Sequence, residues 1–244
     1  MNLLLLRPHD DWLDRRSVQL DDQRAHHIRT VLKPSVGDFL RAGMVGGKQG
    51  RAVITALTSE GVSLHGDFQD PPPPRHRFDI VLALPRPKML RRVLRTVAEF
   101  GVAHLHLINT ARVEKSYWQS PLLADAKVEE ALLAGMERAS DTLMPQVHRH
   151  QLFRPFVEDR LASLCAGRPC WIAQMGSADS LRDKSPHQAL VLVGPEGGFV
   201  PFELDLLQRV NARQVHLGSR TLSVDTALTT CLLYTSDAAD ETGR

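Results

Sequence analysis

The feature that most restricts the fold is a regular alternation of strand-like and helix-like segments after residue 74. Residues 79–84 form a continuous apolar run, which is typical of a strand buried on both faces of a parallel sheet. Residues 90–98 then place apolar side chains at i, i+3, i+4, i+7 and i+8, as an amphipathic helix requires. This alternation predicts an α/β fold, with a parallel sheet and helices on both of its faces.

The same pattern continues toward the C-terminus. Further strands are predicted at residues 104–108, 170–173, 189–193 and 215–217, and further helices at residues 125–138, 156–165 and 202–210. In the last of these helices, Leu204, Leu207 and Val210 have the spacing of an inward face.

Four consecutive prolines, residues 71–74, mark a change in the pattern of apolar runs and turns. Before them, short apolar runs separated by glycine turns predict a small β-rich domain with one short helix near residues 21–31. A proline run favours a stiff extended spacer, although it is also compatible with a surface loop. We therefore expect a β-rich domain over residues 1–70, a linker at 71–74 and an α/β domain over residues 75–230.

Composition narrows the class of protein. The chain is 43% apolar and 24% charged and contains no run of eighteen apolar residues, so a membrane span is not expected. Its three cysteines cannot form a disulfide framework, which favours a reducing cytoplasm. Cys165 and Cys170 have no second pair beside them, so no metal site is expected.

The most informative stretch is a buried strand that leads into a glycine-rich turn. Residues 190–193 read LVLV and residues 194–199 read GPEGGF. The spacing matches neither a phosphate-binding loop nor a dinucleotide fingerprint, and either a tight turn or a cofactor loop would explain the glycines. A second turn, at residues 217–227, also follows a strand, and Asp225 and Thr226 suit the start of a helix after it.

Together these segments resemble the RsmE family of SPOUT methyltransferases. VGPEGGF at residues 193–199 is similar to its IGPEGGF loop, and LGSRTLSVDTA at residues 217–227 is similar to its LGPRILRTETA loop. TVAEFGV at residues 96–102 resembles a KATELGV helix end. Residues 27–38 resemble the HHxxxVLRxxxGD stretch of its PUA-like β-barrel.

The resemblance implies a knotted α/β domain, with a C-terminal trefoil knot, that works as a homodimer. It implies S-adenosyl-L-methionine as cofactor and N3 of one uridine in 16S rRNA of the small ribosomal subunit as methyl acceptor. Two other hypotheses remain: a SPOUT methyltransferase acting on tRNA, and a non-catalytic RNA-binding protein.

The resemblance also assigns a cofactor site along three loops. The residues are Gln174, Gly176, Val193, Gly194, Glu196, Gly197, Gly198, Leu217, Gly218, Leu222 and Thr226. The chain departs from the family at two points: Gln174 and Met175 replace the first two residues of an HPG motif, and Ser223 stands where the family has arginine.

Catalysis at uracil N3 requires removal of the imide proton, and the base must be unpaired or flipped out. Glu196 is the best-placed carboxylate for the proton, although it could instead orient its loop. Arg220 could stabilise the resulting anion or form a structural ion pair.

RNA contacts are predicted from a run of positive charge. Five cations and no acid occur within ten residues: Arg86, Lys88, Arg91, Arg92 and Arg95. They fall largely opposite the apolar face of their helix, where they could neutralise phosphates or form a solvated face. Arg7, His27 and Arg29 could extend this track, although ordinary packing would also explain the histidine.

The end of the chain has a different character. Residues 231–241, CLLYTSDAADE, resemble a translated transposase sequencing adapter. We therefore expect residues 231–244 to be foreign to the natural chain and the last native helix to be cut short. Without the charged residues of this tail, the formal net charge rises from +2 to +4.

Overall fold

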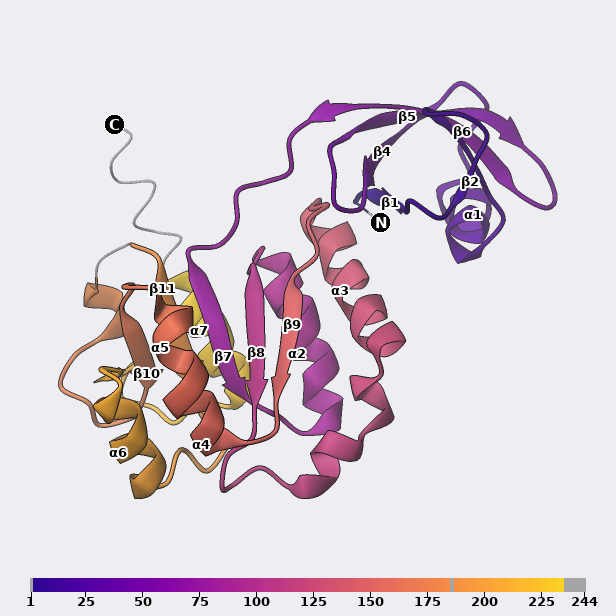
Figure 1. Cartoon of the computed structure of the whole chain (residues 1–244). Helices are drawn as coiled ribbons and strands as arrows, with labels where there is room; N and C mark the ends of the chain where they lie inside the picture. Colours follow the sequence, from indigo (N-terminus) through magenta and orange to yellow (C-terminus); the bar gives the residue numbers. More distant parts are fainter. Residues whose placement is uncertain (1, 185–186, 235–244) are drawn as a thin grey trace, which may run out of the picture. The chain divides into compact units, whose positions relative to one another are not determined.

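A computed structural model describes residues 2–184 and 187–234 (Figure 1). The chain divides into two compact units. The first comprises Met1–Pro74 together with Leu133–Met144, and the second comprises Arg75–Leu132 together with Pro145–Arg244.

The first unit contains a six-stranded sheet with the order β1-β4-β5-β6-β3-β2. Its strands are β1 (Leu4–Leu6), β2 (Asp11–Trp12), β3 (Ser17–Leu20), β4 (Phe39–Met44), β5 (Gln49–Leu57) and β6 (Val62–Asp70). All pairings are antiparallel except that of β1 with β4. A short helix, α1 (Gln23–His27), continues as a π-helical turn, Ile28–Leu32, close to the predicted position.

Alternating side chains of this sheet form the core of the first unit. Val18 and Leu20, Ala52 and Ile54, and Val62 and Leu64 are buried, with Ala25 and Ile28 of the helical segment packed among them. Residues 133–144, which the sequence groups with the α/β domain, belong to this unit. The backbone N–H of Leu3 donates to the Glu137 carbonyl at 3.2 Å, and that of Gly46 to the Thr142 carbonyl at 2.8 Å.

The second unit contains a six-stranded sheet with the order β12-β10-β11-β7-β8-β9, in which every pairing is parallel. The strands are β7 (Phe78–Ala83), β8 (His104–Ile108), β9 (Gln146–His150), β10 (Cys170–Ala173), β11 (Ala189–Val193) and β12 (Arg213–Val215). Every residue of β7 and β11 is buried, as their continuous apolar runs predict. The predicted α/β fold with a parallel sheet is confirmed.

Helices cover both faces of this sheet. The helical segments are α2 (Pro87–Glu99), α3 (Asp125–Ala139), α4 (Phe153–Pro155), a π-helical turn Phe156–Leu161, α5 (Ala162–Cys165), α6 (Pro201–Arg209) and α7 (Val224–Leu233). Three short 3₁₀ turns lie at Lys115–Gln119, Pro121–Leu123 and Leu181–Asp183. Helix α7 packs beside α2 and against β11, and Figure 1 shows α4 and α5 on the opposite face. Within the described residues, none of the helices combines the length and apolar character needed to cross a bilayer.

Three sequence expectations are wrong in detail. The inward face of α6 is formed by Glu203, Leu206 and Leu207, whereas Leu204 and Val210 are partly exposed. The last strand ends at Val215, because the chain turns at His216 to bond with the backbone of Asp179. Strand β9 is not predicted from the sequence, because its polar sequence QVHRH lacks an apolar run.

The predicted tail begins inside α7. Cys231 and Leu232 are fully buried, and the helix runs to Leu233. Residues 235–244 of the predicted tail lie outside the described residues.

Candidate functional site

A cavity of about 230 Å³ lies where β10, β11 and β12 end. Because the three strands are parallel, their carboxyl ends meet at one edge of the sheet, which is where open α/β sheets bind ligands. Its lining residues are Ala173, Gln174, Met175, Val193, Gly194, Pro195, Glu196, Gly197, Gly198, Leu217, Gly218, Arg220, Thr221, Leu222, Val224 and Ala227.

The first loop, residues 194–200, depends on its glycines. Gly198 has φ +73°, in the left-handed region, and its N–H donates to the Pro195 carbonyl at 2.8 Å. A Cβ on Gly194 would lie 3.1 Å from the ring of Phe199. The loop therefore folds tightly and presents backbone groups, rather than side chains, to the cavity.

Two residues from elsewhere hold this loop. The buried carboxylate of Glu203 accepts from the N–H of Val200 at 3.0 Å and from the N–H of Ala111 at 2.7 Å. The guanidinium of Arg112 donates to the Gly197 carbonyl and, at 3.5 Å, to the Gly198 carbonyl. Together they join the segment after β8 to the loop 194–200. Neither residue carried a sequence signal, because neither lies in the loops that resemble the family.

The other two loops are joined to each other. The N–H of Gln174 donates to the Val215 carbonyl at 2.9 Å, and the Thr221 hydroxyl donates to the sulfur of Met175 at 3.5 Å. Gly218 has φ +122°, and the Tyr234 hydroxyl donates to the neighbouring Leu217 carbonyl at 3.2 Å. The three loops therefore form one continuous wall.

Most of the predicted cofactor residues meet in this cavity. Gln174, Val193, Gly194, Glu196, Gly197, Gly198, Leu217, Gly218 and Leu222 all line it, as does Arg220. Gly176 and Thr226 lie beside lining residues without lining it themselves, and the Thr226 hydroxyl instead contacts that of Ser223 at 2.9 Å. The sequence missed Val224 and Ala227, because their small apolar side chains enter the cavity from α7.

Among the described residues, the two predicted catalytic residues, Glu196 and Arg220, are the only charged ones in the lining. The Glu196 carboxylate lies 2.7 Å from Nη2 of Arg86, and both side chains are exposed. The hydrogen bond and charge of Glu196 raise the pKa of Arg86. The described lining of the cavity contains no histidine, cysteine or lysine. Among the described residues, no group of three or more histidines, cysteines and acids is arranged to hold a metal ion.

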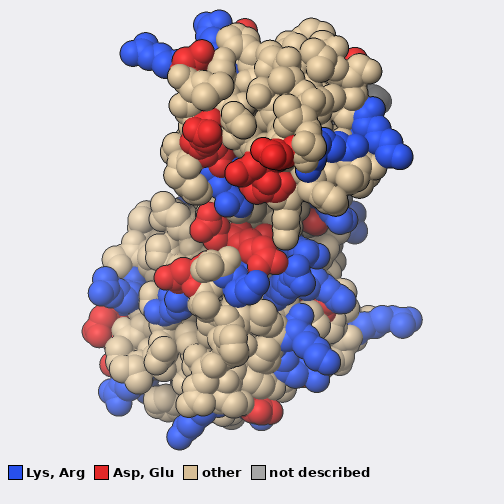
Figure 2. All heavy atoms as spheres, turned by 90° about the vertical axis from the view of Figure 1, so that its right-hand side faces the viewer, with Lys and Arg blue, Asp and Glu red and all other residues tan. Residues whose placement is uncertain are grey.

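The five cations at the start of α2 and along it form a run uninterrupted by acids in the sequence, but they differ in their partners in the structure. Acids from distant segments pair with three of them: Arg86 with Glu196, Arg91 with Glu130 at 3.5 Å, and Arg92 with Asp225 at 2.8 Å. Figure 2 shows both acidic and basic side chains on one face of the molecule. Arg86, Lys88 and Arg92 line a second cavity with Tyr117, of about 570 Å³. Arg95 keeps a buried Nε without a partner among the described residues.

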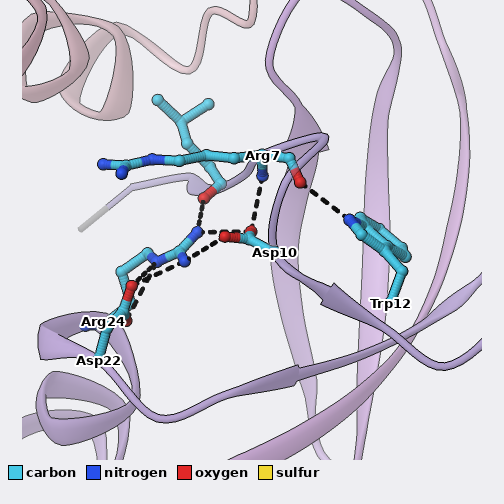
Figure 3. Close-up of polar contacts among 6 residues, drawn as sticks. Arg7, Asp10, Trp12, Asp22 and Arg24 are labelled. Carbon is cyan, nitrogen blue, oxygen red and sulfur yellow. Dashed lines mark hydrogen bonds and ion pairs between the residues drawn. The ribbon is translucent and has the colours of Figure 1, made fainter.

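The predicted RNA residues of the first unit have partly structural roles. The backbone of Arg7 is fixed by Asp10, which accepts its N–H at 2.7 Å, and by Trp12, whose indole donates to its carbonyl at 2.8 Å (Figure 3). Arg24, rather than Arg7, forms the buried ion pair with Asp10, at 2.7 Å. Arg29 donates to the Thr58 and Ser59 carbonyls, and Nε2 of His27 has no partner within the described part of the chain.

Comparison with known proteins places the second unit and its cavity in a family. The RNA methyltransferase domain family matches residues 71–236, which cover both glycine loops and all six strands of the parallel sheet. The chain belongs to this family. The expectation of a methyltransferase is thereby confirmed at the level of the family.

Individual proteins are similar to this chain over nearly its whole length. A protein of Treponema pallidum named ribosomal RNA small subunit methyltransferase E is 28% identical over 236 residues, covering 93% of this chain and 87% of the relative. A structure of a protein of that name from Neisseria gonorrhoeae, bound to S-adenosyl methionine, has a TM-score of 0.74 at 20% identity, covering 99% and 97% of the two chains. A probable rRNA methyltransferase from Porphyromonas gingivalis has a TM-score of 0.76 at 21% identity over both full chains. The resemblance of the two loops to the RsmE family is confirmed.

Proposed function

We propose that this chain is an S-adenosyl-L-methionine-dependent enzyme that methylates N3 of one specific uridine in 16S rRNA of the small ribosomal subunit. The observation that carries the proposal is the cavity at the carboxyl edge of β10, β11 and β12, where the two loops that resemble the family come together. The relatives named ribosomal RNA small subunit methyltransferase E support the substrate class.

The lining of the cavity fits this cofactor. Glycines 194, 197, 198 and 218 leave backbone N–H and C=O groups accessible, and Leu222, Val224 and Ala227 supply an apolar wall. When bound, S-adenosylmethionine supplies a methyl group on a positively charged sulfonium. We assign its binding to the residues lining the three loops, with Gly176 and Thr226 as neighbours that support them.

Glu196 and Arg220 remain the candidates for handling the uracil imide. The Glu196 carboxylate lies in the cavity wall, 2.7 Å from Nη2 of Arg86, and a positioned carboxylate can accept a proton from a substrate. Arg220 lines the same cavity and can stabilise negative charge that develops on the uracil ring.

The RNA surface is assigned to the exposed cations of α2, Arg86, Lys88, Arg91 and Arg92, with Arg95 beside them. On the PUA-like first unit, RNA contacts are assigned to Arg7, His27 and Arg29. Exposed ion pairs contribute only about 0–1 kcal/mol, so phosphates can replace Glu196, Glu130 and Asp225 as partners at little cost.

A C-terminal trefoil knot and a homodimer complete the proposal. Strand β12 pairs with β10 rather than with β11, and α7 then returns to pack on β11 and α2. This path is consistent with a knot formed by the segments that line the cavity. Sedimentation analysis of the full chain would test the dimer.

The deciding experiment is methylation with labelled S-adenosylmethionine and small ribosomal subunits that lack the modification, followed by nucleoside analysis. We expect labelled N3-methyluridine from 16S rRNA. Label in tRNA alone would favour the tRNA alternative, and RNA binding without cofactor affinity would favour a non-catalytic binder.

Two glycines supply a matched control. Gly198 and Gly167 both have positive φ, +73° and +80°, and neither has an atom within 4 Å of an added Cβ, but only Gly198 lines the cavity. An alanine at either position carries the same backbone strain, of roughly 1–2 kcal/mol. Gly198→Ala should abolish most of the cofactor affinity, whereas Gly167→Ala should retain it. Equal losses in both variants would point to general destabilisation and away from this site.

A further inference from the structure

The second unit contains another cavity, lined by residues of the parallel sheet and of the segment 160–168. It has a volume of about 710 Å³ and is lined by Asp79, His104, His106, His148, Arg149, His150, Arg160, Ser163, Leu164, Arg168 and Leu190. Asp79 and Leu190 lie in register near the amino ends of β7 and β11. The cofactor loops follow the carboxyl ends of the strands, so this cavity is separate from the candidate cofactor site.

Four of its lining residues form a ladder of imidazoles. His104 and His106 project from β8, His148 and His150 project from β9, and His106 is paired in register with His148. Their rings stack, with centroids of His106 and His148 4.5 Å apart at an interplanar angle of 14°. The alternate positions of two neighbouring parallel strands thus place all four rings on one face of the sheet.

Hydrogen bonds join the imidazoles in two pairs. Nδ1 of His104 lies 3.2 Å from Nε2 of His148, and Nδ1 of His106 lies 3.1 Å from Nε2 of His150. Each bond uses one nitrogen of each ring, so every ring retains a second nitrogen for another partner. The cluster therefore has unused hydrogen-bonding capacity within a cavity.

Arginines surround this ladder. Arg168 donates to Asp79 at 2.7 Å, which neutralises the single acid that lines the cavity. Arg149 pairs with Asp125 at 2.8 Å. The guanidinium of Arg160, from the π-helical turn, is exposed and has no hydrogen bond or ion pair with the described residues. The Ser163 hydroxyl donates to the Arg160 carbonyl at 2.7 Å. Among the described residues, the cavity thus combines a free guanidinium and four imidazoles with no unpaired carboxylate.

The surroundings of the ladder lower the pKa of three of its histidines. Burial, together with the neighbouring imidazoles and Arg168, lowers the pKa of His106 to about 3. Burial lowers the pKa of His148, repulsion from His104 lowers it further, and Asp79 partly opposes the effect. Burial also lowers the pKa of His150, and repulsion from His148 and Arg160 adds to this. A bound anion would raise these pKa values again, because a negative charge stabilises the protonated rings.

We propose that this cavity is a binding site for a phosphate group, held by Arg160, Arg168 and the free nitrogens of the histidine ladder. A tetrahedral oxyanion can accept from donors that converge from both the sheet and the facing helical segment, as the donors of this cavity do. Binding takes up protons on the ladder, so affinity rises as the pH falls.

The test measures binding of sulfate to the full chain by NMR of the histidine rings, at constant ionic strength. Sulfate is a tetrahedral dianion whose charge is constant between pH 6 and 8. We expect the signals of His106, His148 and His150 to shift, with binding about tenfold tighter at pH 6 than at pH 8. Shifts that chloride reproduces at equal ionic strength, or binding that does not depend on pH, would overturn the proposal.

Two variants and a control make the result specific. Arg160→Gln should weaken sulfate binding about tenfold, because it removes a charged donor from the cavity. Arg154→Gln, an exposed arginine on α4 outside the lining, should not. His150→Gln should reduce the pH dependence, because it removes one of the titrating rings. Equal effects of Arg160→Gln and Arg154→Gln would show that only surface charge is involved.

Competition identifies the source of the phosphate. Displacement of sulfate by a short RNA, but not by uridine monophosphate, supports a backbone phosphate of RNA as the ligand. Displacement by the mononucleotide supports a small phosphate compound. Displacement by neither, at concentrations well above the sulfate Kd, would overturn the assignment to phosphate.

Discussion

The guanidinium of Arg112 donates to the carbonyl oxygen of Gly197, and the absence of a side chain on Gly197 makes this contact possible. A Cβ at Gly197 would lie 2.8 Å from Cδ of Arg112. The arginine follows β8 and the glycine follows β11, so the contact joins two loops at the carboxyl edge of the sheet. It fixes the backbone that lines the candidate cofactor cavity.

Replacing Arg112 should therefore weaken cofactor binding without unfolding the protein. We expect Arg112→Ala to raise the Kd for S-adenosylmethionine about tenfold, equivalent to 1.4 kcal/mol. The melting temperature should barely change, because the side chain is exposed. Arg112→Lys retains the charge but not the fork of donors, and should recover only part of the affinity. Titration calorimetry measures both, and an unchanged Kd in Arg112→Ala would contradict the positioning role.

Glu203 should matter for stability as well as for the loop. Both of its carboxylate oxygens accept backbone N–H bonds, from Ala111 and Val200, and the side chain is buried. Glu203→Gln replaces one acceptor with a donor, which leaves the N–H of Ala111 or Val200 facing a donor and should cost about 1–3 kcal/mol. Urea unfolding measures the difference. Asp205→Asn, exposed on the same helix, should lie within about 0.5 kcal/mol of the parent.

Two adjacent leucines test whether the end of α7 contributes to the core. Leu232 is fully buried and Leu233 is 48% exposed. Leu232→Ala should lower the free energy of unfolding by about 2–5 kcal/mol, because it leaves a cavity. Leu233→Ala should change it much less. If the two variants have equal stability, the segment that resembles an adapter does not pack as the structure has it.

The histidine ladder predicts acid sensitivity. The pKa of His106 is lowered to about 3 in the folded protein, against 6.5 for a free side chain, so between these values the unfolded chain binds more protons. Stability should therefore fall as the pH drops below about 6.5, by up to about 1.4 kcal/mol per pH unit for this residue. Urea unfolding between pH 7.5 and 5.5, in buffer free of phosphate and sulfate, measures the slope. His106→Gln should reduce it, whereas His9→Gln, an exposed residue of the first unit, should not.

Lys88 provides the simplest test of the RNA surface. It is exposed and forms no ion pair with the described residues, unlike Arg86, Arg91 and Arg92. If it neutralises one phosphate, Lys88→Ala should reduce the slope of log K for RNA against log salt by about 0.7–0.9. Arg209→Ala, an exposed cation at the end of α6, serves as control. Equal slopes for Lys88→Ala and the parent would remove Lys88 from the surface.

The sequence predicts best what is local. The runs that become β7 and β11 and the apolar face of α2 need only their own residues, and the glycine loops can be read because each directly follows a strand. Glu203 could not be predicted as buried, because its partner Ala111 is 92 residues away in sequence. The polar strand that carries His148 was missed because its burial depends on the helical segment packed over it.

The same limit explains the charges of α2. Sequence showed an unopposed run of cations, yet Arg86 and Arg92 have acid partners 110 and 133 residues away. Only the parallel arrangement of β7 and β11 brings the start of α2 beside the glycine loop.

The pair of Arg86 and Glu196 has a thermodynamic consequence. The guanidinium stands at the start of the basic helix, and the carboxylate belongs to the cavity wall. A nucleic-acid phosphate that takes Arg86 as partner releases Glu196 from it. By reciprocity, a ligand that changes how Glu196 is held changes the affinity of Arg86 for the phosphate by the same factor. We therefore expect occupancy of the cavity and capture of the polynucleotide to be coupled through one exposed ion pair.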